Sequence, residues 1–191
     1  MKKLLLLAVA MLISVMANAQ VSVQVGYEVN TMKSKMSAPI KSETTHHYNG
    51  IFAAVDYNLS LVDRLSVAPG IGIDFLFSNN YGLKYRELGL HVPIDFNYRF
   101  PINDGFSLSV FAGPTFYYGL SSKDLAETPH YNYFGDESKR FDLSLGGGVW
   151  CDIVDRIRFK VGYKFGLTNT SKLSDCTDKD NTFYISVGYL F

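Results

Sequence analysis

The 191-residue sequence has only two cysteines, a single tryptophan and no excess of charge of either sign. Its 18 basic residues balance 18 acidic ones, whereas a protein that binds nucleic acid usually carries a basic excess. We therefore expect no nucleic-acid partner. Beyond the first fifteen residues no apolar run approaches the roughly 20 residues of a transmembrane helix. Any membrane crossing by the rest of the chain would have to use strands.

The two cysteines are predicted to stay unpaired. Cys151 falls at one end of a predicted strand, and Cys176 falls in a loop at the far end of the next. A strand of about a dozen residues, at about 3.3 Å each, separates them by tens of ångströms. A disulfide needs Cα atoms within about 7 Å, so we expect no intrachain bridge.

Residues 1–19 have the pattern of a secretory signal peptide. Lys2 and Lys3 precede an apolar run, and Ala17-Asn18-Ala19 provides a small-x-small cleavage site. Cleavage before Gln20 would leave residues 20–191 as one domain. The alternative is a retained amino-terminal anchor helix. The cleavage site favours the signal peptide, and the absence of cysteine at the cut argues against a lipoprotein anchor.

The last ten residues, TFYISVGYLF, alternate between two kinds of side chain and end on an aromatic residue. Alternation with a period of two is typical of a strand whose faces meet different environments. A terminal strand of this kind resembles the one by which outer-membrane β-barrels are recognised for insertion. The same alternation predicts eight strands: residues 21–30, 51–61, 65–77, 88–100, 106–118, 141–153, 157–167 and 182–191.

The connections between these segments alternate in length. Residues 62–64, 101–105 and 154–156 make short turns. Residues 33–49, 78–84, 123–140 and 172–181 make longer polar loops. This layout predicts an all-β fold, a closed eight-stranded antiparallel up-and-down transmembrane β-barrel with both termini at the short-turn end. Its last strand would pair with residues 21–30.

Alternation alone also fits a soluble, lipocalin-like barrel with its apolar face inward. Three features favour the inverted arrangement, the first being that the predicted signal peptide and the terminal Phe191 agree with an outer-membrane barrel. The polar face is rich in glycine, which suits a narrow eight-strand lumen and would weaken a solvent-facing sheet. Aromatic residues gather near segment ends on the apolar face, as in interfacial girdles. These are Tyr98, Phe100, Phe106, Phe141, Phe165 and Phe191.

The polar face would then line a lumen that holds charges of both signs. Charges inside a barrel are tolerated when they are paired or hydrated, so we expect an internal network of ion pairs. The alternative is a gated ion path, although eight strands leave an interior about filled by side chains. The predicted network consists of Glu28, Asp56, Asp74, Glu87, His91, Asp95, Arg99, Asp142, Arg158, Lys160 and Lys164.

Three prolines fall inside predicted strands: Pro69, Pro93 and Pro114. Proline removes a backbone donor, and a closed barrel has no edge to accommodate the loss. Each should therefore mark a β-bulge or a shortened pairing.

The stretches LHVPIDFNYRF, APGIGIDF and VGYKFGLTN resemble strands of small PorT-like outer-membrane β-barrel proteins. The wider group includes barrels of the OmpX and OmpA transmembrane type. The resemblance covers most of residues 20–191 and implies the same fold, with no defined molecular activity. Unlike the OmpA type, the sequence ends at Phe191 with no peptidoglycan-binding domain after it.

Candidate catalytic residues are sparse. His46 and His47 lie in the first predicted loop beside Glu43, Thr44 and Thr45. Neighbours in a flexible loop do not make a preorganised acyl-transfer site, and the histidine pair lacks evident further metal ligands. His91 and Asp95 share a strand face about 13 Å apart, too far for a direct pair. We expect no catalytic, cofactor or metal site.

The third predicted loop is the best candidate contact surface, because exposed aromatic residues with flanking charges suit a protein or glycan ligand. Its residues His130, Tyr131, Tyr133 and Phe134 could equally extend the barrel wall. We therefore expect a non-enzymatic, monomeric protein in the lipid of the bacterial outer membrane. Its termini would be periplasmic, and its extracellular loops would serve a structural or surface-interaction role. The alternatives are a lipid- or peptide-modifying enzyme and a narrow ion channel.

Overall fold

The computed structural model describes residues 19–37, 41–79, 84–126 and 131–191. For residues 19, 131, 135 and 136 only the backbone is described. The elements are β1 (Ala19–Met36), β2 (Ser42–Val62), β3 (Leu65–Ser78), β4 (Tyr85–Asn103), β5 (Phe106–Asp124), β6 (Tyr131–Asn132), α2 (Tyr133–Asp136), β7 (Phe141–Ile153), β8 (Ile157–Gly166) and β9 (Cys176–Leu190).

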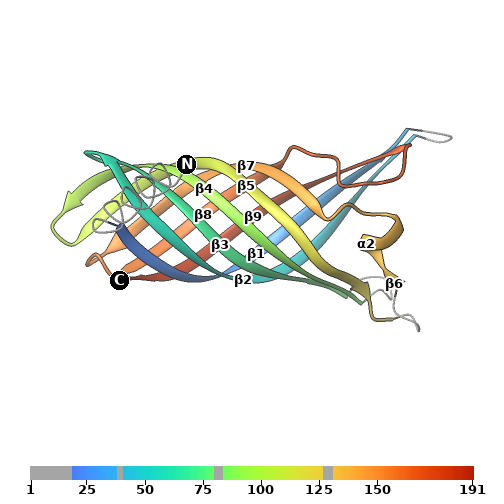
Figure 1. Cartoon of the computed structure of the whole chain (residues 1–191), viewed down its shortest axis with the longest axis horizontal. Coiled ribbons are helices and arrows are strands. Elements are labelled where there is room, and N and C mark those ends of the chain that lie inside the picture. Colours follow the sequence, from blue (N-terminus) through green and yellow to red (C-terminus); the bar gives the residue numbers. More distant parts are fainter. Residues whose placement is uncertain (1–18, 38–40, 80–83, 127–130) are drawn as a thin grey trace, which may run out of the picture.

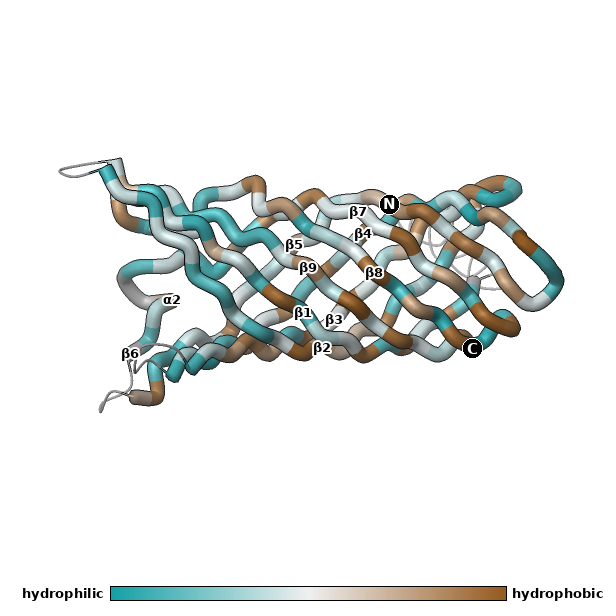
Figure 2. The backbone as a smooth tube through the Cα atoms, turned by 180° about the vertical axis from the view of Figure 1, so that it is seen from behind, coloured by the Kyte–Doolittle hydropathy of each residue, from teal (hydrophilic) through white to brown (hydrophobic). Residues whose placement is uncertain are grey.

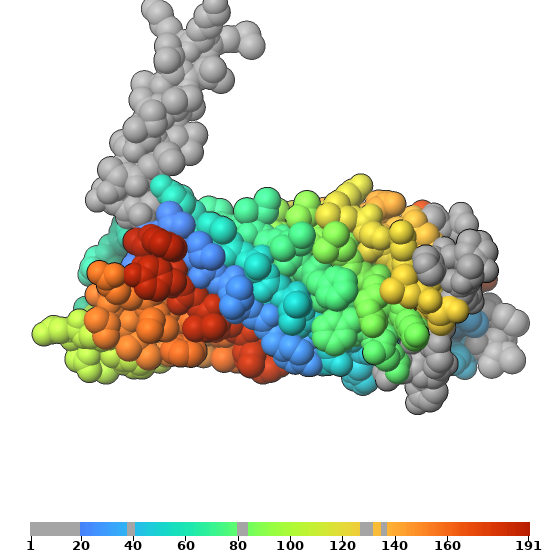
Figure 3. All heavy atoms as spheres, turned by 90° about the horizontal axis from the view of Figure 1, so that it is seen from below, coloured from blue at the N-terminus to red at the C-terminus, as the bar shows by residue number. Residues whose placement is uncertain are grey.

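Eight long antiparallel strands form a closed ring, as predicted (Figure 1). Consecutive strands pair with each other around the ring, β5 pairs with β7, and the two-residue β6 attaches to β5. The ring closes where β9 pairs with β1, from Ser22 opposite Leu190 to Met36 opposite Cys176. In Figure 3 the end of β9 (red) lies directly beside the start of β1 (blue).

The apolar face of each strand points out of the ring, which confirms the inverted arrangement. On β1, Val25 is 57% exposed while its neighbour Gln24 is only 5% exposed. The same contrast recurs on β4, where Phe96 is exposed and Asp95 is buried. Such a ring presents hydrocarbon to lipid and satisfies its backbone groups internally. Among the residues that the structure describes, no helix is long and apolar enough to cross a membrane.

The two ends of the barrel differ. The tight turns β2–β3, β4–β5 and β7–β8 lie at the same end as the carboxy-terminus, and the longer connections lie at the other (Figure 1). We call these the turn end and the loop end. Hydrophilic residues gather at the loop end, whereas apolar residues dominate toward the turn end (Figure 2).

The first predicted loop is mostly a regular hairpin. Strands β1 and β2 continue in register out to Met36 opposite Ser42, so the prediction of a loop over residues 33–49 is wrong. Strand β9 likewise begins at Cys176, inside the predicted loop 172–181, and pairs with the extended part of β1. The polar side chains that suggested loops are those of strands that have left the apolar band.

The prolines interrupt strand pairing without shifting its register. Pairing of β3 with β4 reaches Pro69 opposite Ile94 and resumes at Gly72. Pairing of β4 with β5 reaches Pro93 opposite Thr115 and resumes at Phe96. These interruptions are the shortened pairing that a missing backbone donor produces. On β5 this gap falls at Gly113 and Pro114, so Pro114 also marks a shortened pairing with β4, while its pairing with Leu145 of β7 is uninterrupted.

The predicted signal peptide lies outside the described residues except for Ala19, the first residue of β1. Both cysteines are free thiols. Cys151 lies near the turn end of β7, whereas Cys176 begins β9 at the loop end rather than lying in a loop.

The two Val-Asp-Arg turns share a sequence but differ in backbone conformation. In the β7–β8 turn both Val154 and Asp155 have positive φ, 52° and 51°, as in a type I′ turn. In the β2–β3 turn only Arg64 has positive φ, 66°. A β-branched residue is strained in this region of the backbone map, so Val154 carries strain that Val62 does not.

Replacement of Val154 by asparagine should therefore stabilise the barrel by about 1 kcal/mol, because asparagine tolerates the left-handed conformation. The equally exposed Val62 provides a matched control, since Val62→Asn relieves no strain. The measurement is the free energy of unfolding in urea for the lipid- or detergent-folded protein. Equal effects of the two substitutions would contradict the strain at Val154.

Candidate functional site

Four aromatic side chains meet inside the lumen at mid-height. Phe52 of β2, Phe111 of β5, Trp150 of β7 and Tyr184 of β9 form one buried cluster with Ala54. The rings of Phe111 and Trp150 stack with centroids 5.3 Å apart, and those of Phe52 and Tyr184 meet edge-on at 6.0 Å. We call these four rings the aromatic plug.

Glycines on the facing strands make room for the plug. A Cβ atom on Gly162 would collide with the ring of Tyr184, and one on Gly148 would collide with Phe111 and with the carbonyl of Val161. The glycine-rich inner face is therefore needed for close approach rather than for turning the chain. Gly148 belongs to the Gly146–Gly148 run of β7.

Two buried cations join the plug to the barrel wall. Lys160 places Nζ 2.6 Å from Asp95 Oδ2 and 4.5 Å from the centre of the Phe111 ring. Arg158 donates to both carboxylate oxygens of Asp152, at 2.7 and 3.0 Å, and lies 4.3 Å above the Trp150 ring. Ion pairing and cation–π contact together offset the cost of burying these charges.

Hydrogen bonds link further predicted lumen residues. His91 Nδ1 lies 2.6 Å from Asp74 Oδ2, so the neighbour of His91 is on β3 and not Asp95 of its own strand. Gln24 donates to Asp56 and accepts from Ser186 at 2.7 Å. The charges of the lumen thus pair across strands, which sequence spacing along one strand does not reveal.

Arg99 is the exception among the predicted lumen residues. It lies at the turn-end rim, its side chain is 44% exposed, and it donates to Asp155 at 2.7 Å. The prediction placed Arg99 inside because its position is in phase with Asp95 and Asn97. Strand β4 continues beyond the rim to Asn103, however. The alternating pattern shows which side of a strand faces inward, but it does not show how far along the barrel a residue lies.

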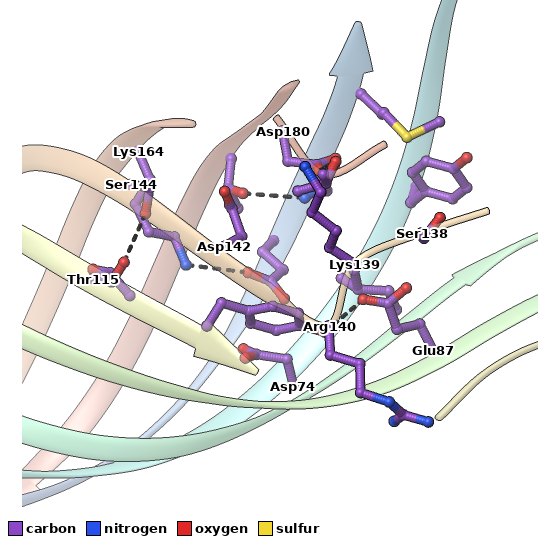
Figure 4. Close-up of a pocket in the computed structure, with 18 of the residues that line it drawn as sticks. Asp74, Glu87, Thr115, Ser138, Lys139, Arg140, Asp142, Ser144, Lys164 and Asp180 are labelled. Carbon is purple, nitrogen blue, oxygen red and sulfur yellow. Dashed lines mark hydrogen bonds and ion pairs between the residues drawn. The ribbon is translucent and has the colours of Figure 1, made fainter. Parts of the chain in front are cut away.

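The plug separates two chambers. The turn-end chamber has a volume of about 540 Å³ and is lined by polar side chains that include Asn97, Arg99 and Asp152. The loop-end chamber is smaller, about 90 Å³, and is shown in Figure 4. Its lining includes Glu28, Glu87, Asp142, Lys164 and Asp180.

Asp180 lies on β9 beyond Phe183, the first outward apolar residue of that strand, and hence outside the apolar band. Burial, together with the nearby carboxylates of Asp142 and Glu87, raises the pKa of Asp180 to about 7. Asp180, Asp142 and Glu87 thus form an acidic group in the wall of the loop-end chamber.

Part of the predicted contact surface is turned into the barrel. Phe134 is buried against Gly119, and the guanidinium of Arg140 lies 5.2 Å from its ring centre. The ring of Tyr133 lies 5.6 Å from that of Tyr85. The expected exposure of Phe134 is wrong, because α2 folds back across the loop-end mouth. His130 lies outside the described residues, and only the backbone of Tyr131 is described.

His46 and His47 lie on the exposed hairpin and not in a flexible loop. They pair with Met32 and Thr31, and Thr31 Oγ1 is 3.1 Å from His47 Nδ1. Within the described ranges, no three histidine, cysteine or carboxylate side chains are grouped to hold a metal ion.

Sequence analysis did not single out the residues that complete the site. Asp152, Asp180 and the four plug rings all occupy in-phase, inward positions of predicted strands or their extensions. Their inward position in the alternating pattern was the signal by which the sequence could have revealed them. Which inward residues meet at one height depends on the stagger between strands, which the sequence does not state.

Comparison with known proteins identifies the family. Residues 5–191 match the family described as "Outer membrane protein beta-barrel domain". The chain belongs to this family. No curated protein sequence matches it.

Solved structures of outer-membrane barrels are similar to this family member. Neisserial surface protein A is 10% identical, with a TM-score of 0.53, and the alignment covers 88% of this chain and 97% of that one. Ail, the attachment invasion locus protein of Yersinia pestis, is 16% identical over 91% and 99% of the two chains, with a TM-score of 0.47. The outer membrane enzyme PagL is 9% identical over 83% and 97%, also at 0.47. At these identities the likeness shows the fold and not the activity.

The ion pair at the plug gives a stability test. Removing only one partner, by Asp95→Leu or Lys160→Met, should cost about 3 to 5 kcal/mol, because the other charge stays buried and unpaired. The double substitution should recover most of that loss. Unfolding titrations of the four proteins measure the coupling. Additive losses would show that Asp95 and Lys160 do not interact.

The plug also predicts the electrical behaviour of the barrel. In planar bilayers the native protein should show no large stable conductance. The double substitution Phe111→Ala and Trp150→Ala should create conducting steps, because it removes two stacked rings between the chambers. A native protein that conducts as strongly as the variant would show that the plug does not close the lumen.

Proposed function

We propose that this outer-membrane protein is a monomeric, non-catalytic surface-recognition protein that binds a protein or glycan through its loop end. In this proposal the turn end and both termini face the periplasm, and the loop end faces the outside of the cell. The signal peptide would direct export. The observation that carries the proposal is the sheet that β1, β2 and β9 extend beyond the apolar band.

This extension is regular and polar. Residues 31–36 of β1 pair with residues 42–47 of β2 on one side and with residues 176–181 of β9 on the other. Six residues at about 3.3 Å each make a projection of about 20 Å. The side chains from Ser42 to His47 are all exposed, and Lys35 Nζ lies 3.4 Å from Glu43 Oε2 across the hairpin.

One edge of the projecting sheet is unoccupied in the described part of the chain. Strand β2 pairs with β3 only from Asn49 onward, so residues 42–48 have no strand on that side. An exposed strand edge offers backbone donors and acceptors to an extended segment of another protein. Side chains of both hairpin strands flank this edge and could give selectivity.

The alternatives have less support. His46 and His47 project into solvent, and the described hydrogen bonds of His91 join it to Asp74 without a hydroxyl or thiol nucleophile. The aromatic plug argues against a channel, since the loop-end and turn-end chambers lie on opposite sides of it.

Shortening the hairpin tests the proposed function. Removing the paired residues Ser34–Lys35 and Glu43–Thr44 preserves the two-residue alternation and should abolish adhesion of cells that display the full protein. Adhesion would be measured on immobilised proteins and glycans. Val154→Asn, at the opposite end, is the matched control. Unchanged adhesion in the shortened variant, with heat-modifiable gel mobility retained, would refute a role for the hairpin.

Surface proteolysis of intact cells tests the orientation separately. Trypsin should cut at Lys33, Lys35 or Lys41, and it should spare the turn-end residues Arg64 and Arg156 until the outer membrane is permeabilised. The reverse order of cleavage would place the loop end in the periplasm.

A further inference from the structure

The loop-end chamber has an excess of carboxylates over cations. Its carboxylates come from five strands. They are Glu28, Asp74, Glu87, Asp142 and Asp180. Among the residues that the structure describes, only Lys164 brings an ammonium within 4 Å of this group, with Nζ 3.8 Å from Glu28 Oε2. At that distance the pair is longer than a good charge-assisted hydrogen bond.

The other basic residues that line the chamber are directed at backbone carbonyls. Arg140 donates to the carbonyls of Gly119 and Leu120, at 3.0 and 2.8 Å. Lys139 donates to the carbonyl of Asn169 at 2.9 Å. Their described contacts thus leave the acidic group short of cationic partners.

Most donors that do reach the carboxylates are neutral. Tyr117 and Tyr85 donate to Glu87, and Thr168 donates to Asp142. Neutral hydroxyl groups satisfy lone pairs, but they add no positive charge to a site of low dielectric constant. One carboxylate oxygen of Asp74, Oδ2, is hydrogen-bonded to the imidazole of His91.

Two buried acceptors in the chamber wall have no hydrogen-bond donor among the described residues. Asp74 Oδ1 and Asn30 Oδ1 accept no hydrogen bond from that part of the chain, although Asp74 is only 2% and Asn30 only 9% exposed. Both residues line the chamber. Leaving a buried acceptor unsatisfied is costly. Because both unsatisfied atoms are acceptors, the missing partner is a hydrogen-bond donor.

The rest of the lining suits an organic cation. The rings of Tyr48, Tyr85, Tyr117 and Phe134 line the same space, and those of Tyr48 and Tyr85 are 4.6 Å apart. Aromatic faces attract ammonium groups. The volume of about 90 Å³ holds roughly six waters, enough for an ammonium on a slender alkyl chain. The described residues offer no grouped ligands for a metal ion.

The geometry points to a binding site for a primary alkylammonium group in the loop-end chamber, with the ammonium donating to Asp74, Asn30 or the neighbouring carboxylates. The group could belong to a free diamine or to a lysine side chain of a peptide. Lys164 already places one such group against Glu28. This inference goes beyond the proposed surface recognition, because it does not depend on the projecting hairpin.

Calorimetric titration of the detergent-folded protein with cadaverine, the five-carbon diamine, tests the site. We expect saturable binding that weakens at least about tenfold in Asp180→Asn, since loss of one partly buried charge interaction is worth about 1.4 kcal/mol or more. Asp63→Asn provides the control, because Asp63 is 95% exposed at the opposite end. Equal affinity of all three proteins, or no binding to the native protein, would overturn the site.

Two further titrants separate the sources of the ammonium. N-acetyl-lysine amide represents a peptide side chain, and 1,5-pentanediol is the uncharged match to cadaverine. Tighter binding of cadaverine assigns the site to a free diamine, and tighter binding of the lysine derivative assigns it to a peptide. Equal binding of pentanediol, or binding of calcium without either amine, would refute an ammonium site.

The variant Lys164→Met keeps the test valid if Asp180→Asn does not fold. It removes the resident ammonium from Glu28, so cadaverine should raise its thermal midpoint more than that of the native protein. The hairpin-shortened protein should bind cadaverine normally, which distinguishes failure of this site from failure of the proposed function. No cadaverine-dependent stabilisation of Lys164→Met would count against the chamber.

Discussion

The closure of the ring between β1 and β9 is the constraint on which the rest of the structure depends. In hydrocarbon an unpaired strand edge is prohibitively costly, so every membrane-embedded backbone group needs a partner within the protein. The interruptions beside Pro69 and Pro93 occur without a change of register, so the apolar face stays outward on either side of them.

Closure with eight strands leaves a narrow lumen, and this width governs the chemistry inside. The rings of Phe111 and Tyr184 fit because Gly148 and Gly162 face them without a side chain. Buried charges persist there because Lys160 and Arg158 meet carboxylates and aromatic faces at once. The same contacts therefore have two effects. They make the buried charges tolerable, and they place the aromatic plug between the two chambers of the lumen.

Beyond the apolar band, water can satisfy unpaired backbone groups, so the sheet need not be closed there. The loop end of the protein is accordingly open. Strands β1, β2 and β9 continue as an open, polar sheet, while α2 turns Phe134 inward over the mouth. The protein therefore presents two unlike features at one end, a projecting strand edge and an acidic chamber beneath a partial cover. They are structurally separate, so they can bind different ligands.

The sequence by itself determined the eight strands of the barrel, because alternation with a period of two is local. The glycine-rich polar face and the aromatic residues near segment ends then indicated which face points inward. It also identified most of the lumen charges, from Glu28 to Lys164, by their phase. Only the tertiary structure decided which of them meet. Stagger between strands pairs His91 with Asp74, brings Lys160 to Asp95 and carries Arg99 out to the rim. These are long-range relations set by register around a closed ring, and no spacing along a single strand encodes them.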